Sequence, residues 1–227
     1  TPIMVDTALM FAAACAAQRI NGMYVKTSDY NNRDKPSNRD IMCALANIAL
    51  VERDPEWTIQ DTDIAQAKDI MDYYRSKTLE IMSGKANGYT MAAANAAFKE
   101  TIASNDHLTI GTIASLPQAH DRSIAYDKTW DRVEGLKRNS QHFGVVGERW
   151  EGTVEVLSCI YSKNWFKYYV TALTAQGNVV NFASDSEFKQ GDSVQISSAK
   201  IKQHATENIT RLHYVRVVRE NAVDTEA

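Results

Sequence analysis

The 227-residue sequence contains only three cysteines and four prolines, and no cysteine belongs to a CxxC pair or a Cys/His cluster. Cys15, Cys43 and Cys159 are odd in number and far apart along the chain. This pattern argues against a disulfide framework and a zinc site, and it favours reduced, mostly buried thiols in a cytoplasmic protein. The five histidines also lack the HxH or HExxH spacing of metal ligands, so we expect neither a metal nor a cofactor.

Long apolar runs are also missing. No stretch approaches the ~20 residues that a membrane-spanning helix needs. The apolar segment Leu9–Ala17 is short and follows no basic residue, which argues against a signal peptide, and Thr1 is expected to remain after removal of an initiator Met. No GxSxG, phosphate-loop or dinucleotide-binding motif occurs. We therefore expect a non-enzymatic protein without membrane contacts. An enzyme with an unrecognised site is the third alternative, after the two binding functions described below.

Neither sign of charge is in large excess. The net charge is −3 at pH 7, which argues against a generally basic surface that coats nucleic acid. The distribution of charge still permits a local basic strip. Residues 148–219 carry nine Lys and Arg against seven Asp and Glu, whereas residues 1–140 carry sixteen against eighteen. The small positive tilt therefore lies in the last third of the chain.

The first 140 residues show the periodicity and the alanine content of helices. The expected helices are Ala8–Ile20, a segment from Ser37 or Asn38 to Val51, Asp61–Gly84, Tyr89–Ser104 and Asp127–Asn139. Gly22 is expected to end the first helix. The pattern from Asp106 to Pro117 does not distinguish a short helix from irregular structure. Because small side chains let neighbouring helices approach closely, residues 1–140 are predicted to form a compact helical domain.

The sequence pattern changes after residue 147, where five segments have the composition of strands. They are Trp150–Tyr161, Phe166–Leu173, Asn178–Ala183, Ser193–His204 and Thr210–Arg219. Ile196 and Ile201 are out of phase in a strand, so a β-bulge near Ser197–Ala199 is expected to return both to one face. Ser184–Gly191 has room for about one helical turn. The predicted fold class is α+β, with an all-helical domain (1–140), a small five-stranded barrel (147–219) and an acidic tail (220–227).

The order of strands and connections suits an OB-like barrel, and an SH3-like barrel is the nearest alternative. Four stretches carry a resemblance, namely WEGTVEV (150–156), YVTALTAQGNVVNFAS (169–184), GDSV (191–194) and KIKQH (200–204). Together they resemble an OB-fold module that recurs in bacteriophage DNA-metabolism proteins. The resemblance covers the last third of the chain and implies nucleic-acid binding by the barrel. The helical domain resembles no family.

We therefore expect a protein that binds single-stranded nucleic acid, with DNA favoured. Its expected role is to assist phage DNA replication, recombination or transcription in the host cytoplasm, with other replication or transcription proteins as partners. The alternative is a structural or interaction subunit whose barrel binds another protein.

The segment Ser162–Tyr169 sets lysine and asparagine among four aromatic residues, and aromatic rings beside cations are what unpaired bases and phosphates require. In an OB-fold, the loops between strands one and two and between strands four and five carry ligand contacts. The candidate nucleic-acid-binding residues are Lys163, Asn164, Trp165, Lys167, Phe182, Lys200, Lys202, His204 and Arg211. Trp165, Lys167 and Phe182 are favoured as ligand-facing. The competing interpretations are that the rings form the barrel core and that the cations form a solvated face.

Overall fold

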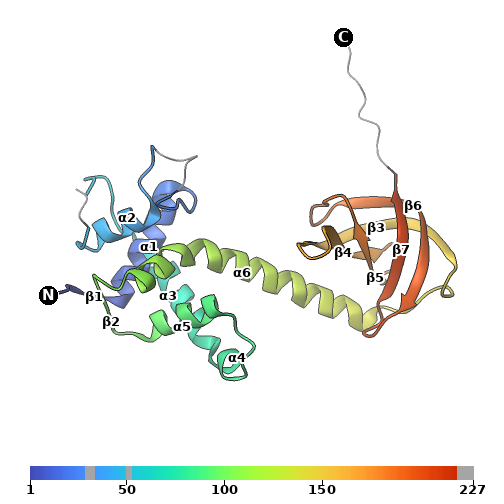
Figure 1. Cartoon of the computed structure of the whole chain (residues 1–227), viewed down its shortest axis with the longest axis horizontal. Helices are drawn as coiled ribbons and strands as arrows, with labels where there is room; N and C mark the ends of the chain where they lie inside the picture. The colour runs from blue at the N-terminus through green and yellow to red at the C-terminus, as the bar shows by residue number, and fades with distance from the viewer. Residues whose placement is uncertain (29–33, 50–52, 219–227) are drawn as a thin grey trace, which may run out of the picture. The chain divides into compact units, whose positions relative to one another are not determined.

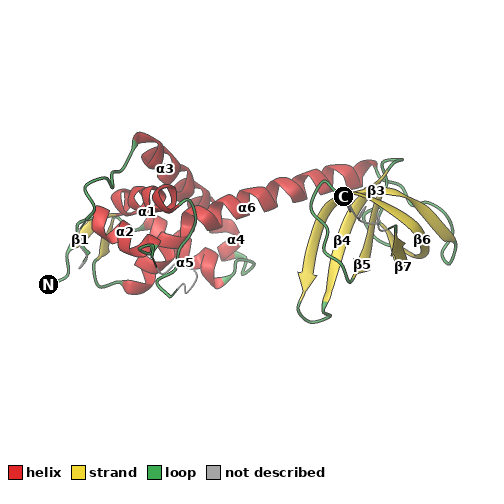
Figure 2. Ribbon diagram, turned by 90° about the horizontal axis from the view of Figure 1, so that it is seen from above, coloured by secondary structure: helices red, strands yellow, loops and turns green. Residues whose placement is uncertain are grey.

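The computed structural model describes residues 1–28, 34–49 and 53–218, and the chain divides into two compact units, residues 1–124 and 125–227. Helices dominate the first unit, which also holds a two-stranded sheet, and a closed five-stranded barrel dominates the second (Figures 1 and 2). The expected α+β order, helical part and then barrel, is confirmed. The predicted acidic tail, 220–227, and Arg219 lie outside the described residues.

The helical unit is built around its first helix. Its elements are β1 (Met4–Asp6), α1 (Thr7–Asn21), α2 (Asn38–Leu45), α3 (Asp61–Ser76), α4 (Thr78–Met82), α5 (Gly88–Phe98), β2 (Thr101–Ala103) and the first part of α6 (His107–Asn139). Every residue from Met10 to Ala17 in α1 is buried, and five of these eight residues are alanines. The small side chains let α2 and α3 pack close beside α1 (Figure 1).

Short polar side chains fix where these helices begin, and one ion pair joins two of them. Ser37 caps α2 by accepting a hydrogen bond from the Asp40 backbone N–H (3.1 Å), and Gly22 ends α1 at a φ of 70°. The buried Asp63 carboxylate accepts from the Gln60 backbone N–H (2.8 Å) and pairs with Arg19 of α1 (2.8 Å). One aspartate thus caps α3 and holds it to α1.

The segment that the sequence pattern left undecided is the start of α6, which continues through Pro117. Asp106 precedes the helix and accepts a hydrogen bond from the Thr109 backbone N–H (3.1 Å). Lys99 Nζ lies 2.8 Å from the other Asp106 oxygen. The lysine first, and then the Thr109 donors, lower the pKa of Asp106 to about 2. No helix in the described ranges is both long and apolar enough to cross a membrane.

We predict that Asp106→Ala lowers the free energy of unfolding by about 1 kcal/mol near neutral pH, because the start of α6 loses its cap. A carboxylate with a depressed pKa stabilises the fold fully above its ordinary pKa, near 3.8, and the contribution disappears as the pH falls toward 2. Denaturant titrations of wild type and variant should therefore converge in that window. Asp34→Ala, in an exposed stretch, is the control. A difference that persists unchanged at pH 2 would contradict the assignment.

The second unit is a closed barrel in which neighbouring strands follow the order β3-β4-β5-β7-β6. Its strands are β3 (Arg149–Ser162), β4 (Lys167–Thr174), β5 (Val179–Ser184), β6 (Ser193–His204) and β7 (Thr210–Val217). All pairings are antiparallel except the one between β5 and β7. Residues 185–192, where the sequence left room for a helical turn, form an irregular loop.

Bulges bend the strands so that their apolar residues meet inside the barrel. Ile196, Ala199 and Ile201 are all buried in one core, although the first two are an odd number of residues apart. The pairing register shifts on both sides of Ser198, which confirms the expected bulge. The core comprises Val154, Val156, Val170, Ala172, Val180, Phe182, Val194, Ile196, Ala199, Ile201 and Leu212.

The second half of α6 packs against the barrel, and this is why the boundary between the units falls within the helix, after Ile124. Val133 is fully buried, and Arg132 pairs with Glu155 of β3 at 2.8 Å. Ser140 Oγ accepts a hydrogen bond from the Val179 backbone N–H and donates one to the Asn208 carbonyl oxygen, both at 2.8 Å. The domain limit expected from the sequence is residue 140, where the helical periodicity ends. Periodicity carries no information about the packing of α6 on the barrel, so it cannot indicate the boundary after Ile124.

A barrel fragment that begins at Gly147 is expected to be less stable than one that begins at Ala125. The shorter fragment loses the burial of Val133 and both hydrogen bonds of Ser140, which together should lower the free energy of unfolding by about 3 kcal/mol. Urea titrations of residues 125–218 and 147–218 measure the difference. Coincident unfolding curves would show that α6 contributes nothing to the barrel.

Candidate functional site

The turn between β3 and β4 presents two large rings to solvent. Trp165 and Phe166 are 70% and 77% exposed, and the neighbouring Lys163 and Asn164 are exposed as well. Phe166 has a φ of 51°, a left-handed conformation that bulky residues rarely adopt. Both the exposure and the backbone conformation are locally unfavourable for an aromatic residue. The turn therefore holds these rings away from the core.

Further aromatic residues continue from the turn along the hairpin. Tyr161 and Tyr168 face each other across the strands, with ring centroids 5.0 Å apart. Tyr169 is 48% exposed and lies on the outer face of β4, because the next residue, Val170, points into the core. We call Tyr161, Trp165, Phe166 and Tyr169 the hairpin aromatic patch. Because Tyr161 pairs with Tyr168, it lies on the opposite face of the hairpin from Tyr169, and the patch therefore surrounds the end of the hairpin beside the two lysines of the turn.

Phe182 does not belong to this surface, although it was expected to face a ligand. Its side chain is only 3% exposed and packs in the barrel core. Phe182 pairs across the strands with Val170 and shares its inward direction with Val180. Strand alternation therefore assigns this ring to folding. The ring that does face outward, Tyr169, was missing from the expected site, and the burial of Val170 is the signal that identifies it.

The two lysines beside the patch differ in their electrostatic surroundings. Lys167 Nζ lies 3.4 Å from Asp185 Oδ1, and both side chains are largely exposed, so solvent screens this pair. Lys163 forms no ion pair among the described residues. Lys163 is therefore the better placed of the two to meet a phosphate.

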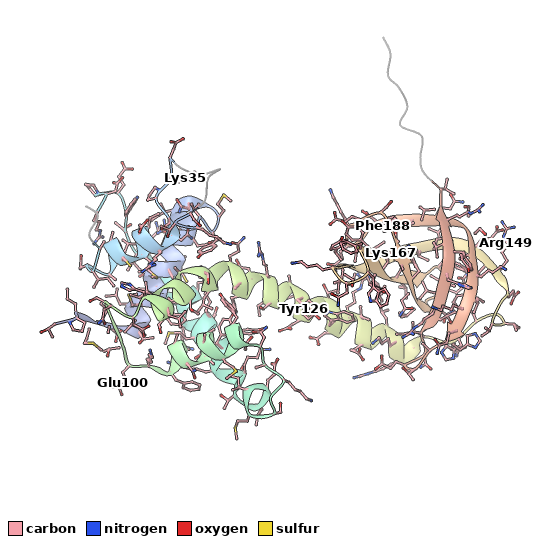
Figure 3. The ribbon with its side chains drawn as sticks, in the orientation of Figure 1. Lys35, Glu100, Tyr126, Arg149, Lys167 and Phe188 are labelled. Carbon is pink, nitrogen blue, oxygen red and sulfur yellow. The ribbon has the colours of Figure 1, made fainter. Side chains whose placement is uncertain are left out.

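The remaining candidate cations lie on a separate surface. Lys200 and Lys202 are exposed on β6, and Arg211 is exposed on β7, where its neighbour Leu212 fills the core. Arg149 of β3 pairs in register with Lys200. Lys167 and Arg149 lie on opposite sides of the barrel in Figure 3. The structure thus divides the expected site into a hairpin group and a group on β6 and β7.

The loop between β6 and β7, expected to flank the ligand, is bound to α6 instead. Glu207 Oε2 lies 2.8 Å from Lys137 Nζ, and the Asn208 carbonyl accepts the hydrogen bond from Ser140. His204 is exposed, but its ring stacks on His142 (centroids 4.8 Å apart, planes within 6°). The contacts of this loop and of His204 therefore serve to hold the barrel to the segment before it.

One cavity of about 270 Å³ lies within the barrel unit. It is lined mainly by apolar side chains of α6, β3 and the loop before β6, with Tyr126 and Phe188 among those labelled in Figure 3. All three cysteines are free thiols, and Cys159 is the one in this cavity. Within the described residues, no group of three or more His, Cys, Asp or Glu side chains could hold a metal ion.

Comparison of the chain with protein-family models, with curated proteins and with solved structures found no match. The arguments for function therefore come from the geometry and charge of the barrel itself.

We predict very different losses of stability for two aromatic truncations in the barrel. Phe182→Ala should lower the free energy of unfolding by about 3–5 kcal/mol, because it leaves a cavity in the core. Trp165→Ala should change it by less than about 0.5 kcal/mol, because the ring is already in solvent. Urea titrations of both variants measure the contrast. An equal loss of stability in both would make Trp165 a core residue and remove it from the site.

Proposed function

We propose that the barrel binds single-stranded nucleic acid, with DNA favoured, and that the protein is a non-enzymatic accessory factor. The observation that carries the proposal is the hairpin aromatic patch, above all the exposed rings of Trp165 and Phe166 beside Lys163. A base that stacks on such a ring contributes about 1–3 kcal/mol, and every base has a face to offer. In a duplex these faces are already stacked on one another, so exposed rings favour unpaired strands.

The charge of the barrel supports the same proposal. Most of the cations on β6 and β7 are exposed and form no ion pairs among the described residues, so they are free to meet phosphates although the whole chain is slightly acidic. The OB-like architecture is frequent among proteins that bind single strands. The preference for DNA and the role in phage replication, recombination or transcription rest on the sequence resemblance alone.

The second candidate function is that of a structural or interaction subunit. It is favoured by the exposed Leu79 and Met82 on α4, since large apolar side chains in solvent are typical of protein contacts. In the proposed function, this helix is a surface for replication or transcription proteins. In the alternative, protein binding is the whole role and the barrel also binds a protein.

Fluorescence anisotropy with matched single- and double-stranded DNA and RNA tests the proposal. We expect single-stranded DNA to bind best, with about 2–4 phosphate contacts and a salt slope of about 0.7 per contact. Trp165→Ala should weaken binding about 5- to 150-fold, and Lys163→Ala should lower the salt slope. Tyr126→Ala, which truncates an exposed tyrosine on α6, is the matched control. Affinity that ignores salt and both site variants would favour protein binding instead.

A further inference from the structure

Tyr214 on β7 combines two unfavourable features away from the hairpin. Its side chain is 76% exposed, and its backbone has a φ of 52°. A left-handed conformation is rare for a bulky residue and costs free energy, which the surrounding strand must supply. Phe166 at the hairpin tip shows the same combination of a strained backbone and an exposed ring. Strained residues of this kind cluster at binding sites.

The conformation of Tyr214 follows from a bulge in β7. Leu212 and Val215 both pack toward the core although they are three residues apart, so the two residues between them share the outer side. The register agrees, because two residues of β7, Tyr214 and Val215, lie opposite one of β6, Ala199, between the pairs Ser198–Arg216 and Lys200–His213. His213 and Tyr214 consequently lie side by side, with ring centroids 4.3 Å apart and planes tilted by 34°.

Cations surround this ring pair. Lys200 is the cross-strand partner of His213, Arg149 is the partner of Lys200, and Arg216 lies two residues beyond Tyr214. All three cations are exposed, and none forms an ion pair among the residues that the structure describes. The carboxylate of Glu148, next to Arg149, accepts a hydrogen bond from the Val145 backbone N–H (2.8 Å). We call Arg149, Lys200 and Arg216 the basic strip.

We propose that His213 and Tyr214 form a second stacking platform, which binds a base of the same single strand that the hairpin aromatic patch binds, while the basic strip contacts its phosphates. This inference rests on the proposed function. A ring pair bordered by exposed cations matches the alternation of bases and phosphates along a strand. An acidic protein surface would satisfy the cations but would not require an aromatic ring held in a left-handed conformation. A strand that contacts both surfaces runs around the barrel from β4 to β7.

The variant Tyr214→Asn separates binding from folding. Asparagine tolerates the left-handed conformation, so the melting temperature should stay the same or rise. Affinity for an oligothymidylate of about 16 nucleotides, the upper end of the range for one OB-fold, should fall about 5- to 150-fold. An oligothymidylate of about 4 nucleotides, which is too short for both surfaces, should lose less than this. Tyr214→Trp should retain binding, and Tyr126→Asn is the matched control.

The basic strip is tested through the salt slope. Lys200→Ala and Arg216→Ala should each lower the slope by about 0.7, because each removes one phosphate contact. Lys128→Ala, on the exposed surface of α6, should leave the slope unchanged.

The outcomes distinguish failure of this stacking platform from failure of the proposed single-strand binding on which it rests. If wild type binds no oligonucleotide, the proposed function fails and the platform fails with it. If Trp165→Ala weakens binding but Tyr214→Asn leaves the long oligonucleotide bound as tightly as wild type, only the platform is overturned. If Tyr214→Asn leaves oligonucleotide binding intact but turns a dimer into a monomer in light scattering, the surface is a contact between two copies of the chain.

Discussion

The barrel and both proposed surfaces depend on the length of β3, which pairs with two neighbours in succession. Its first half pairs with β6 up to Glu155, and its second half pairs with β4 from Val154 to Ser162. Because β3 changes partner along its length, the sheet closes into a barrel and both halves of β3 are paired with a neighbouring strand. The change of partner also means that the outer part of the β3–β4 hairpin has lost the support of β6. The tip that carries Trp165 therefore extends from the barrel, and its rings meet solvent rather than core.

Much of the architecture is present in local sequence patterns. Strand-like composition locates all five barrel strands, and the odd spacing of Ile196 and Ile201 locates a bulge between them. Ser37 and Gly22 mark the ends of helices for stereochemical reasons that act within a few residues. What the patterns do not contain is long-range packing. The three-residue strands β1 and β2 are too short to show alternation, and the hold of α6 on the barrel arises from residues distant in sequence.

The same limit explains which parts of the site could be foreseen. Trp165 could be assigned to solvent because a loop tip exposes it in either strand register. Choosing between Phe182 and Tyr169 requires knowing which face is inward, and the mixed composition of β4 does not reveal this. The exposure of Tyr214 is harder to predict, because it follows from a bulge in β7. The isoleucine spacing that predicts the bulge in β6 has no counterpart in β7. Ring exposure in this barrel is thus decided by register, and register is a property of strand pairs.

The parallel pairing of β5 and β7 has a consequence for motion. Only two residue pairs, Val180–Thr210 and Asn181–Arg211, join these strands, whereas every other pair of neighbours is joined along a longer ladder. Local opening begins where the fewest hydrogen bonds must break, so the barrel is expected to open most readily at this seam between β5 and β7. Beyond Arg211, β7 and the ring of Tyr214 are held by β6 alone. Amide protons along β7 should thus exchange with solvent sooner than those in the centre of β3, and a molecule bound across the seam would slow them.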